Sequence, residues 1–162
     1  MLKIDPFRDE DWPEVWAMLE PVFRAGETYP CDPAITEEEA RRYWAEATEA
    51  SYVARDGDGR AVGAFYIRPD QPGLGDHVCN CGYVVAQNAR GRGLAVQLCR
   101  RSQEIARGRG YRAMKFNLVV ATNQAAVRAW LKSGMRIIGT IPKAFRHARL
   151  GLVDAHVMFK EM

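Results

Sequence analysis

Long apolar runs and histidine clusters are missing from this 162-residue sequence, which has only three histidines. No stretch approaches the roughly 20 consecutive apolar residues that a membrane-spanning helix requires. Charged residues soon follow Met1–Asp5, where a secretory signal would have an apolar segment. His77, His147 and His156 are not spaced as metal ligands. The sequence therefore predicts a globular protein of the cytoplasm that binds no metal.

A strong excess of charge of either sign is also missing. Lys and Arg number 23 and Asp and Glu 20, so the net charge is only +3, which does not by itself indicate a nucleic-acid partner. Hydrophobic residues make up 48% of the chain, too many for intrinsic disorder. At this length we expect one domain spanning residues 1–162.

Cysteine pairs with zinc-ligand spacing do not occur among the four cysteines. Cys79 and Cys81 have one residue between them instead of two to four, and no second pair follows. They lie in an apolar run, and no histidine is placed to activate them as nucleophiles. We expect reduced cysteines that pack in the core.

Positive charge is concentrated between Arg90 and Arg112, which contains seven arginines. Such a block suits a phosphate-bearing ligand, although a solvated helix face would look the same. A nucleic-acid-binding domain that uses this block is the alternative from a different functional class. It would need interleaved aromatic residues, and only Tyr111 is placed in this way.

Hydrophobic periodicity in the first half predicts two helices among several strands. The first helix begins after Asp9 or Asp11, and Pro21 should kink or end it. A second helix begins at Thr36, where Glu39 completes a capping box. The expected strands are 3–7, 51–55, 61–68 and 78–86.

The second half alternates strands and helices and then ends in two strands. A helix is expected over 94–107, and another from Thr122 or Asn123 with Ala126, Val127, Trp130 and Leu131 facing inward. The expected strands are 114–120, 135–141 and 154–159. This order predicts a single α/β domain with a mixed sheet.

The junction at Arg90-Gly91-Arg92-Gly93-Leu94-Ala95 has a strand before it and a helix after it. Glycines allow positive φ and close approach of a ligand, and the free N–H groups at a helix start bind anions. A pyrophosphate fits these features. Val96 stands where a Rossmann fingerprint needs its third glycine, and no Gly-Lys-Ser/Thr of a P-loop occurs.

Two motifs resemble those of the GNAT superfamily of N-acetyltransferases. The segment from Arg90 to Ala95 matches its (Arg/Gln)-x-x-Gly-x-(Gly/Ala) signature. Downstream, Asn123, Ala126 and Gly134-Met135 follow its Asn-x-x-Ala…Gly-Phe pattern. The chain is identified as a member, which implies a GNAT-like mixed, centrally splayed β-sheet flanked by helices.

The resemblance implies that acetyl-CoA, as co-substrate, lies between strands 78–86 and 114–120. Backbone N–H groups would hold the pyrophosphate at Arg90, Gly91, Arg92, Gly93, Leu94 and Ala95. Pantetheine would bind along Val84, Val85 and Ala86, where one N–H would polarise the thioester carbonyl. Asn123 would contact the cofactor and cap its helix.

Acetyl transfer in this superfamily proceeds by direct attack of a neutral amine on the thioester. Many relatives use a tyrosine as general acid where this chain has Trp130, which leaves the acid unassigned. The candidate catalytic residues are Asn117 and Glu27, the latter as a base directly or through water, unless it is an exposed loop carboxylate. Asn80 and Tyr29 are the candidate acceptor-binding residues. Either asparagine could instead bond a neighbouring loop.

The acceptor predicted from these features is a small-molecule amine or amino acid. A protein N-terminus or lysine is the alternative, which the acidic early helices keep open. The tail from Ile138 to Arg146 and from Val153 to Ala155 resembles a subgroup that includes fungal acetyltransferases of azetidine-2-carboxylate and related proline analogues. Dimers are common among relatives, so a homodimer is also possible.

Overall fold

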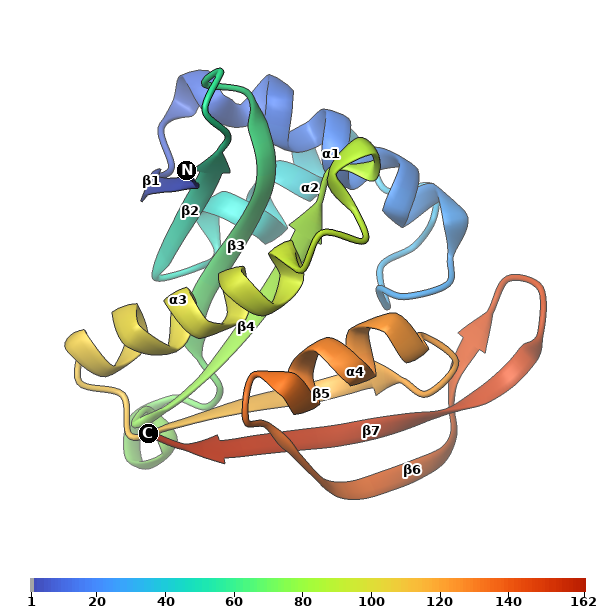
Figure 1. Ribbon diagram of the computed structural model, residues 1–162. Coiled ribbons are helices and arrows are strands. Elements are labelled where there is room, and N and C mark those ends of the chain that lie inside the picture. The colour runs from blue at the N-terminus through green and yellow to red at the C-terminus, as the bar shows by residue number, and fades with distance from the viewer. Residues whose placement is uncertain (1) are drawn as a thin grey trace.

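The computed structural model describes residues 2–162. A seven-stranded sheet has the strand order β1-β2-β3-β4-β5-β7-β6 (Figure 1). The strands are β1 (Lys3–Pro6), β2 (Ala50–Arg55), β3 (Ala61–Pro69), β4 (Val78–Val85), β5 (Ala113–Val120), β6 (Arg136–His147) and β7 (Gly151–Glu161). Neighbours β4 and β5 are parallel and the other neighbouring pairs antiparallel, which confirms the expected mixed sheet.

Four α-helices accompany the sheet: α1 (Trp12–Ala25), α2 (Glu37–Arg41), α3 (Leu94–Gly108) and α4 (Gln124–Lys132). A π-helical segment, Arg42–Glu46, continues α2. The predicted capping box is confirmed, because Thr36 Oγ1 accepts from Glu39 N–H at 3.2 Å and Glu39 accepts from Thr36 N–H at 2.9 Å. Within residues 2–162 no helix has the length and apolarity needed to cross a bilayer.

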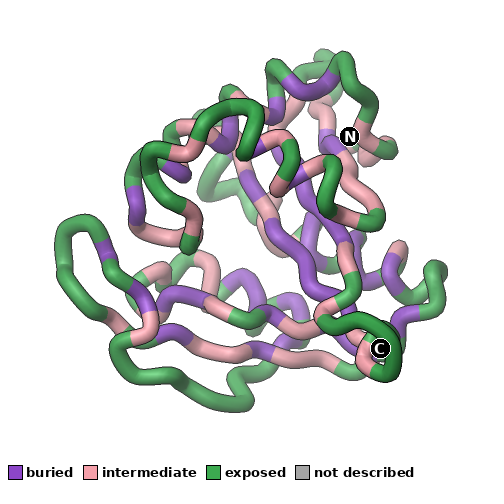
Figure 2. Tube along the Cα trace, turned by 180° about the vertical axis from the view of Figure 1, so that it is seen from behind, coloured by how far each residue is buried: buried purple, intermediate pink, exposed green. Residues whose placement is uncertain are grey.

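The sheet has a hydrophobic cluster on each face, because side chains alternate along its strands. On β3, Phe65 and Ile67 belong to the cluster that includes α3 and α4 residues, whereas Ala64 and Tyr66 belong to the α1 and α2 cluster. Figure 2 shows the buried residues concentrated along the central strands. The predicted core packing of Cys79 and Cys81 is confirmed, and Cys99 is buried in the same cluster; all three are free thiols.

Of the two outcomes predicted at Pro21, a kink or the end of the first helix, the second is wrong. The helix α1 runs on to Ala25, and Gly26, with φ of +63°, follows as its C-cap. Leu19 and Phe23 on either side of the proline are both buried. Packing of this helix face therefore outweighs the one hydrogen bond that proline cannot donate.

The predicted inward stripe of the last helix is wrong at Leu131, which is 47% exposed. Ala129 and Trp130 are the buried residues of α4 instead. Successive residues of a helix point roughly 100° apart, so a short helix that buries Trp130 against the sheet turns Leu131 toward solvent.

The last two strands are longer than predicted. Strand β6 continues through Pro142 to His147, and β7 begins at Gly151 rather than near Asp154. Pro142 is tolerated because β6 is an edge strand and its register with β7 shifts between Ile141 and Phe145.

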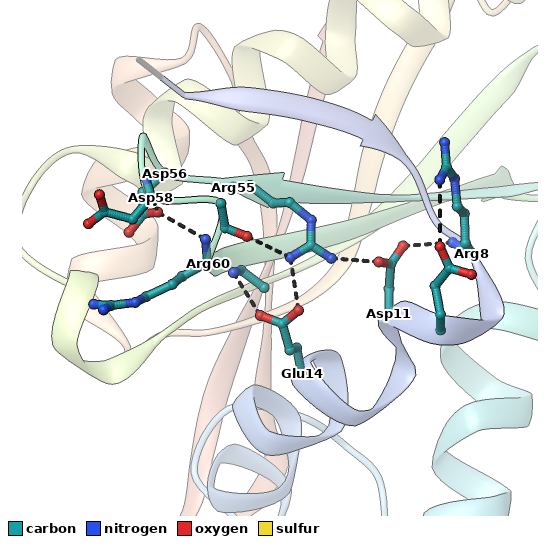
Figure 3. Close-up of polar contacts among 10 residues, drawn as sticks. Arg8, Asp11, Glu14, Arg55, Asp56, Asp58 and Arg60 are labelled. Atoms are coloured by element: carbon teal, nitrogen blue, oxygen red, sulfur yellow. Dashed lines mark hydrogen bonds and ion pairs between the residues drawn. The ribbon is translucent and has the colours of Figure 1, made fainter.

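An ion-pair network joins the start of α1 to strands β2 and β3 (Figure 3). The Arg55 guanidinium donates to Asp11 at 2.5 Å and to Glu14 at 2.8 Å. The second oxygen of Glu14 accepts from the N–H of Ala61 at 2.9 Å. The side chains of Arg55 and Asp11 are only 22% and 11% exposed, so both charges of this pair are neutralised within the chain.

Candidate active site

Strands β4 and β5 begin side by side and then separate. They pair at Val78 with Ala113 and at Cys79 with Met114, and then diverge as Figure 1 shows. At the start of this gap the side-chain amide of Asn80 donates to the carbonyl of Lys115 at 2.9 Å. A cavity of about 700 Å³ extends from the gap to the start of α3, which is the size range of small-molecule binding sites.

The start of α3 carries a row of free backbone N–H groups from Gly91 to Val96, whereas the N–H of Arg90, predicted to belong to this row, donates to the carbonyl of Gln87 at 3.4 Å. Gly91 and Gly93 have φ of +77° and +75°, and a Cβ at either would meet nothing within 4 Å. Within residues 2–162 no protein group accepts a hydrogen bond from the N–H groups from Gly91 to Val96. Together with the positive end of the helix dipole, these N–H groups form a cradle that is suited to an anion.

The open edge of β4 offers fewer free amides than expected. The N–H of Ala86 donates to the carbonyl of Val62 at 2.9 Å, and its carbonyl accepts from Ala89 N–H. In an antiparallel pair, every second residue directs its backbone N–H and C=O toward the neighbouring strand. The N–H of Val84 is therefore also directed toward β3, whereas the N–H of Val85 is directed toward the cavity. Of the three residues expected to bind pantetheine through their backbone, Val84, Val85 and Ala86, only Val85 has an N–H that is free to do so.

Tyr29 contacts the edge of β4 that faces the gap. Its hydroxyl donates to the carbonyl of Tyr83 at 2.8 Å and accepts from the N–H of Tyr83 at 2.9 Å. Burial raises the pKa of Tyr29 well above its ordinary value, so the hydroxyl keeps its proton. Tyr29 thus lines the cavity, as predicted, and attaches the loop between α1 and α2 to β4.

The two candidate asparagines of the acceptor side both line the cavity. Asn80 is 7% exposed, and its carbonyl oxygen Oδ1 receives no hydrogen bond from residues 2–162. Asn117 lies on β5 and is exposed. The structure therefore brings Asn80, Asn117 and Tyr29 together in one cavity.

Glu27 is not among the residues that line this cavity. Its carboxylate accepts from Arg149 Nε at 2.6 Å, and Gly26 beside it accepts from Ala148 N–H at 3.0 Å. The hydrogen bond from Arg149 lowers the pKa of Glu27, which makes it a weaker base. These contacts tie the loop to the turn between β6 and β7.

Trp130 lies in an aromatic group at the cavity wall. Its ring centroid is 4.8 Å from that of Tyr83 and 5.3 Å from that of Phe116. The Tyr83 hydroxyl hydrogen-bonds Ser102 at 2.7 Å, and burial raises the pKa of Tyr83 well above its ordinary value. The raised pKa keeps the Tyr83 hydroxyl protonated, and its hydrogen bond joins it to Ser102 of α3.

Asn123 caps a helix and also lines the cavity. Its side-chain oxygen accepts from Ala126 N–H at 3.3 Å and caps α4, as predicted. It also lines the cavity, so the cap and the predicted cofactor contact are compatible.

The charges that line the cavity are all positive. Among the described residues the lining contains no Asp, Glu or His, and its charged members are Arg68, Arg90, Arg128 and Lys132. The described residues also form no group of three or more His, Cys, Asp or Glu side chains that could hold a metal ion. The cavity therefore favours anionic ligands and contains no carboxylate or imidazole base.

The sequence analysis did not identify Tyr43, Tyr66 and Arg68 as site residues, yet all three line the cavity. Tyr66 and Arg68 are two residues apart on β3 and therefore share a face, which alternation alone could have indicated. Their position beside Asn80 depends on the register of β3 with β4.

Comparison with known families agrees with this geometry. A model of the acetyltransferase (GNAT) family matches residues 12–135. The chain belongs to the GNAT family. N-acetyltransferase aca1 of Schizosaccharomyces pombe is 30% identical over 148 residues, covering 82% of this chain and 71% of that protein.

Solved GNAT structures have the same fold. A GCN5-related N-acetyltransferase from Kribbella flavida has a TM-score of 0.93 at 40% identity, covering 99% of this chain and 98% of that one. A GNAT phosphinothricin acetyltransferase from Sinorhizobium meliloti in complex with AcCoA has a TM-score of 0.86 at 14% identity, covering 99% of this chain and 88% of that one. The protein is an acyltransferase with the GNAT fold, as its motifs predicted.

Proposed function

We propose that this GNAT protein transfers the acetyl group of acetyl-CoA to the nitrogen of a small-molecule amine or amino acid. The amine attacks the thioester carbon, the C–N bond forms, the C–S bond breaks, and coenzyme A leaves as the thiolate. The observation that carries the proposal is the row of unbonded N–H groups from Gly91 to Val96 beside a cavity between two splayed strands. The AcCoA complex of the Sinorhizobium meliloti relative supports this choice of acyl donor.

Three parts of the chain would hold the acyl donor. The cradle from Gly91 to Val96 suits the diphosphate, and Asn123 lies where it can contact the same molecule. Val85 N–H, directed toward the cavity, is the proposed hydrogen-bond donor to the pantetheine of the acyl donor.

Proton transfer would not use a carboxylate of the cavity lining, since the described lining has none. Asn117 is the proposed catalytic residue, because its amide oxygen can accept a hydrogen bond from the attacking nitrogen. The proton then leaves to water. Glu27 could act as the base only after losing Arg149, so we place it second.

A protein N-terminus or a lysine is the less favoured acceptor. A lysine side chain is an ammonium until it is deprotonated, and the described cavity lining offers it no negative charge. The nucleic-acid alternative is weakened because Arg101 pairs with Glu104 and Arg109 with Glu49. The proline-analogue subgroup stays a prediction about the acceptor.

A cytoplasmic homodimer is the proposed state of the protein. Large apolar side chains of β6, β7 and the turn between them are exposed, namely Ile137, Ile138, Ile141, Leu150 and Leu152. Apolar side chains on an edge strand are typical of a surface that another chain covers. Sedimentation of the purified protein should give twice the monomer mass, and a monomer at all concentrations contradicts this part.

The experiment that tests the reaction is a thiol-release assay with acetyl-CoA. We expect release of coenzyme A that depends on the added acceptor, across amines, amino acids, proline analogues and peptides, together with an acceptor mass increase of one acetyl group. Thiol release that is the same without acceptor, or acetylation of peptides alone, contradicts the proposal.

A further inference from the structure

Arg68 is a positively charged side chain held at a fixed place in the cavity wall. Its guanidinium carbon lies 5.5 Å from the ring centroid of Tyr43 and 5.1 Å from that of Tyr66. The hydroxyls of these two tyrosines are 3.3 Å apart. Trp44, fully buried, packs against Tyr66 at 5.0 Å between ring centroids. Aromatic faces attract the cation but do not neutralise it.

Arg68 has no neutralising partner among the residues that the structure describes. Among residues 2–162 no carboxylate lies within 4.0 Å of its guanidinium, and no oxygen accepts a hydrogen bond from it. The carboxylate next along the chain, that of Asp70, is already paired with Lys115 at 2.9 Å. A partly buried guanidinium with five unused donors is suited to binding an oxyanion from outside the chain.

The position of Arg68 separates it from the cradle for the acyl donor. Arg68 lies on β3 directly opposite Asn80 on β4, at the start of the gap. The remaining cations of the cavity lining, Arg90, Arg128 and Lys132, lie beyond the far end of β4 or on α4. Arg68 is therefore not placed to bind the diphosphate held at the start of α3.

We propose that Arg68 binds the carboxylate of an amino-acid acceptor and selects acceptors that carry one. This inference rests on the proposed acetyl transfer and names the acceptor class. Side chains directly opposite in an antiparallel pair are about 5 Å apart at Cβ. The free oxygen of Asn80 can thus accept from the amine while Arg68 binds the carboxylate of the same molecule. An α-amino or α-imino acid, whose nitrogen and carboxyl carbon are two bonds apart, fits this pair.

The same arrangement disfavours acceptors that are only cationic. A polyamine or an amino sugar would place positive charge beside Arg68 in a cavity whose described lining has no acid. Like charges at such distances repel, and the partly desolvated site strengthens the repulsion. Arg68 thereby provides selection against these amines as well as for amino acids.

The test compares each amino acid with its own amide, which keeps the amine but loses the negative charge. The twenty common amino acids, L-proline among them, are tested as acceptors. The wild-type protein should acetylate at least one of them with a kcat/KM about 10- to 100-fold above that for the corresponding amide. Arg68→Gln should lower kcat/KM for the acid by about the same factor, through KM, and change that for the amide less than about threefold. Arg68→Lys should retain part of the activity because it keeps the charge.

Controls separate this inference from the proposed function. Arg60→Gln, at an exposed arginine outside the cavity lining, should leave both acceptors unchanged. Calorimetry should give the same affinity for coenzyme A in the wild type and Arg68→Gln. Equal kcat/KM for acid and amide in the wild type overturns the inference even if the variant does not fold. Absence of turnover with every amine, although coenzyme A binds, overturns the proposed function and the inference with it.

Discussion

Two arginines on neighbouring strands of the same sheet have opposite surroundings. Arg55 on β2 donates to Asp11 and Glu14, as Figure 3 shows. Arg68 on β3 contacts two tyrosine rings and no carboxylate. The two carboxylates raise the pKa of Arg55, mainly through the hydrogen bond with Glu14. A charge neutralised by its own chain stabilises the fold, whereas a charge left open is available to a ligand.

The same contrast holds between the two regions around these residues. In the network at Arg55, the guanidinium forms ion pairs with two carboxylates, those of Asp11 and Glu14. The described cavity lining has four cationic side chains and unbonded N–H groups, with no acid. The folded chain therefore keeps positive potential at one place, where an anionic substrate would supply the missing partner.

Introducing an acid into the cavity should have the largest effect. Gly93→Asp places a carboxylate at the cradle and a side chain at φ of +75°, and we expect the affinity for coenzyme A to fall at least about 100-fold. Gly73→Asp is the matched control, since Gly73 also has positive φ and open space but lies in the exposed 3-10 helix Gly73–Gly75, outside the cavity lining. Calorimetry measures both, and equal loss in the two variants would contradict the cradle.

Removing the charge at Arg55 should affect stability instead of catalysis. Arg55→Gln leaves Asp11, only 11% exposed in its side chain, without its cation, and we expect the free energy of unfolding to fall by about 1–3 kcal/mol. Denaturant unfolding measures this loss, while kcat/KM of the remaining folded enzyme should stay unchanged. If Arg55→Gln lowered the affinity for the acceptor without lowering the free energy of unfolding, Arg55 and Arg68 would not differ in role as proposed.

The network at Arg55 should also make stability depend on pH. The hydrogen bond from Arg55 lowers the pKa of Glu14 from its ordinary value of 4.5, so its contribution is present above 4.5 and is lost as the pH falls through the lower folded value. Glu14→Gln should therefore be less stable than wild type at pH 7, with the difference shrinking by pH 3. A difference that is constant between these pH values would contradict the ionic role.

The smallest effect is expected at a largely exposed ion pair on α3. Arg101 and Glu104 are 2.8 Å apart, but their side chains are 52% and 61% exposed. Arg101→Gln should change the free energy of unfolding by less than about 0.5 kcal/mol and leave coenzyme A affinity unaffected. A large loss in either measurement would show that the arginine block has a role beyond solvation.

Features whose hydrogen bonds close within a few residues were predictable from the sequence. Thr36 and Glu39 bond each other across three positions, and Asn123 caps the helix that begins beside it. The glycines before α3 were predictable for the same reason, because left-handed backbone at a helix start is a local property. These local features were enough to identify the family and the cradle.

Features that depend on partners far along the chain were not predictable. The Tyr29 hydroxyl hydrogen-bonds the backbone N–H and C=O of Tyr83, 54 residues away. These groups lie on the edge of β4 that faces the gap, and they are therefore not free to bind a ligand. The passage of α1 through Pro21 depends on packing against the sheet, and the extension of β6 through Pro142 depends on its place at the edge. Glu27 could not be placed without the turn that carries Arg149.

The sequence by itself determined the order of helices and strands, the alternation that builds two cores, and the anion cradle before α3. Each of these follows from backbone conformations and patterns within one segment. The tertiary structure decided which charges have partners, since the register of β3 with β4 places Arg68 beside Asn80, and no carboxylate of residues 2–162 lies within 4.0 Å of its guanidinium. Neutralisation is a matter of distances of a few ångström between segments, and only folding brings such segments together.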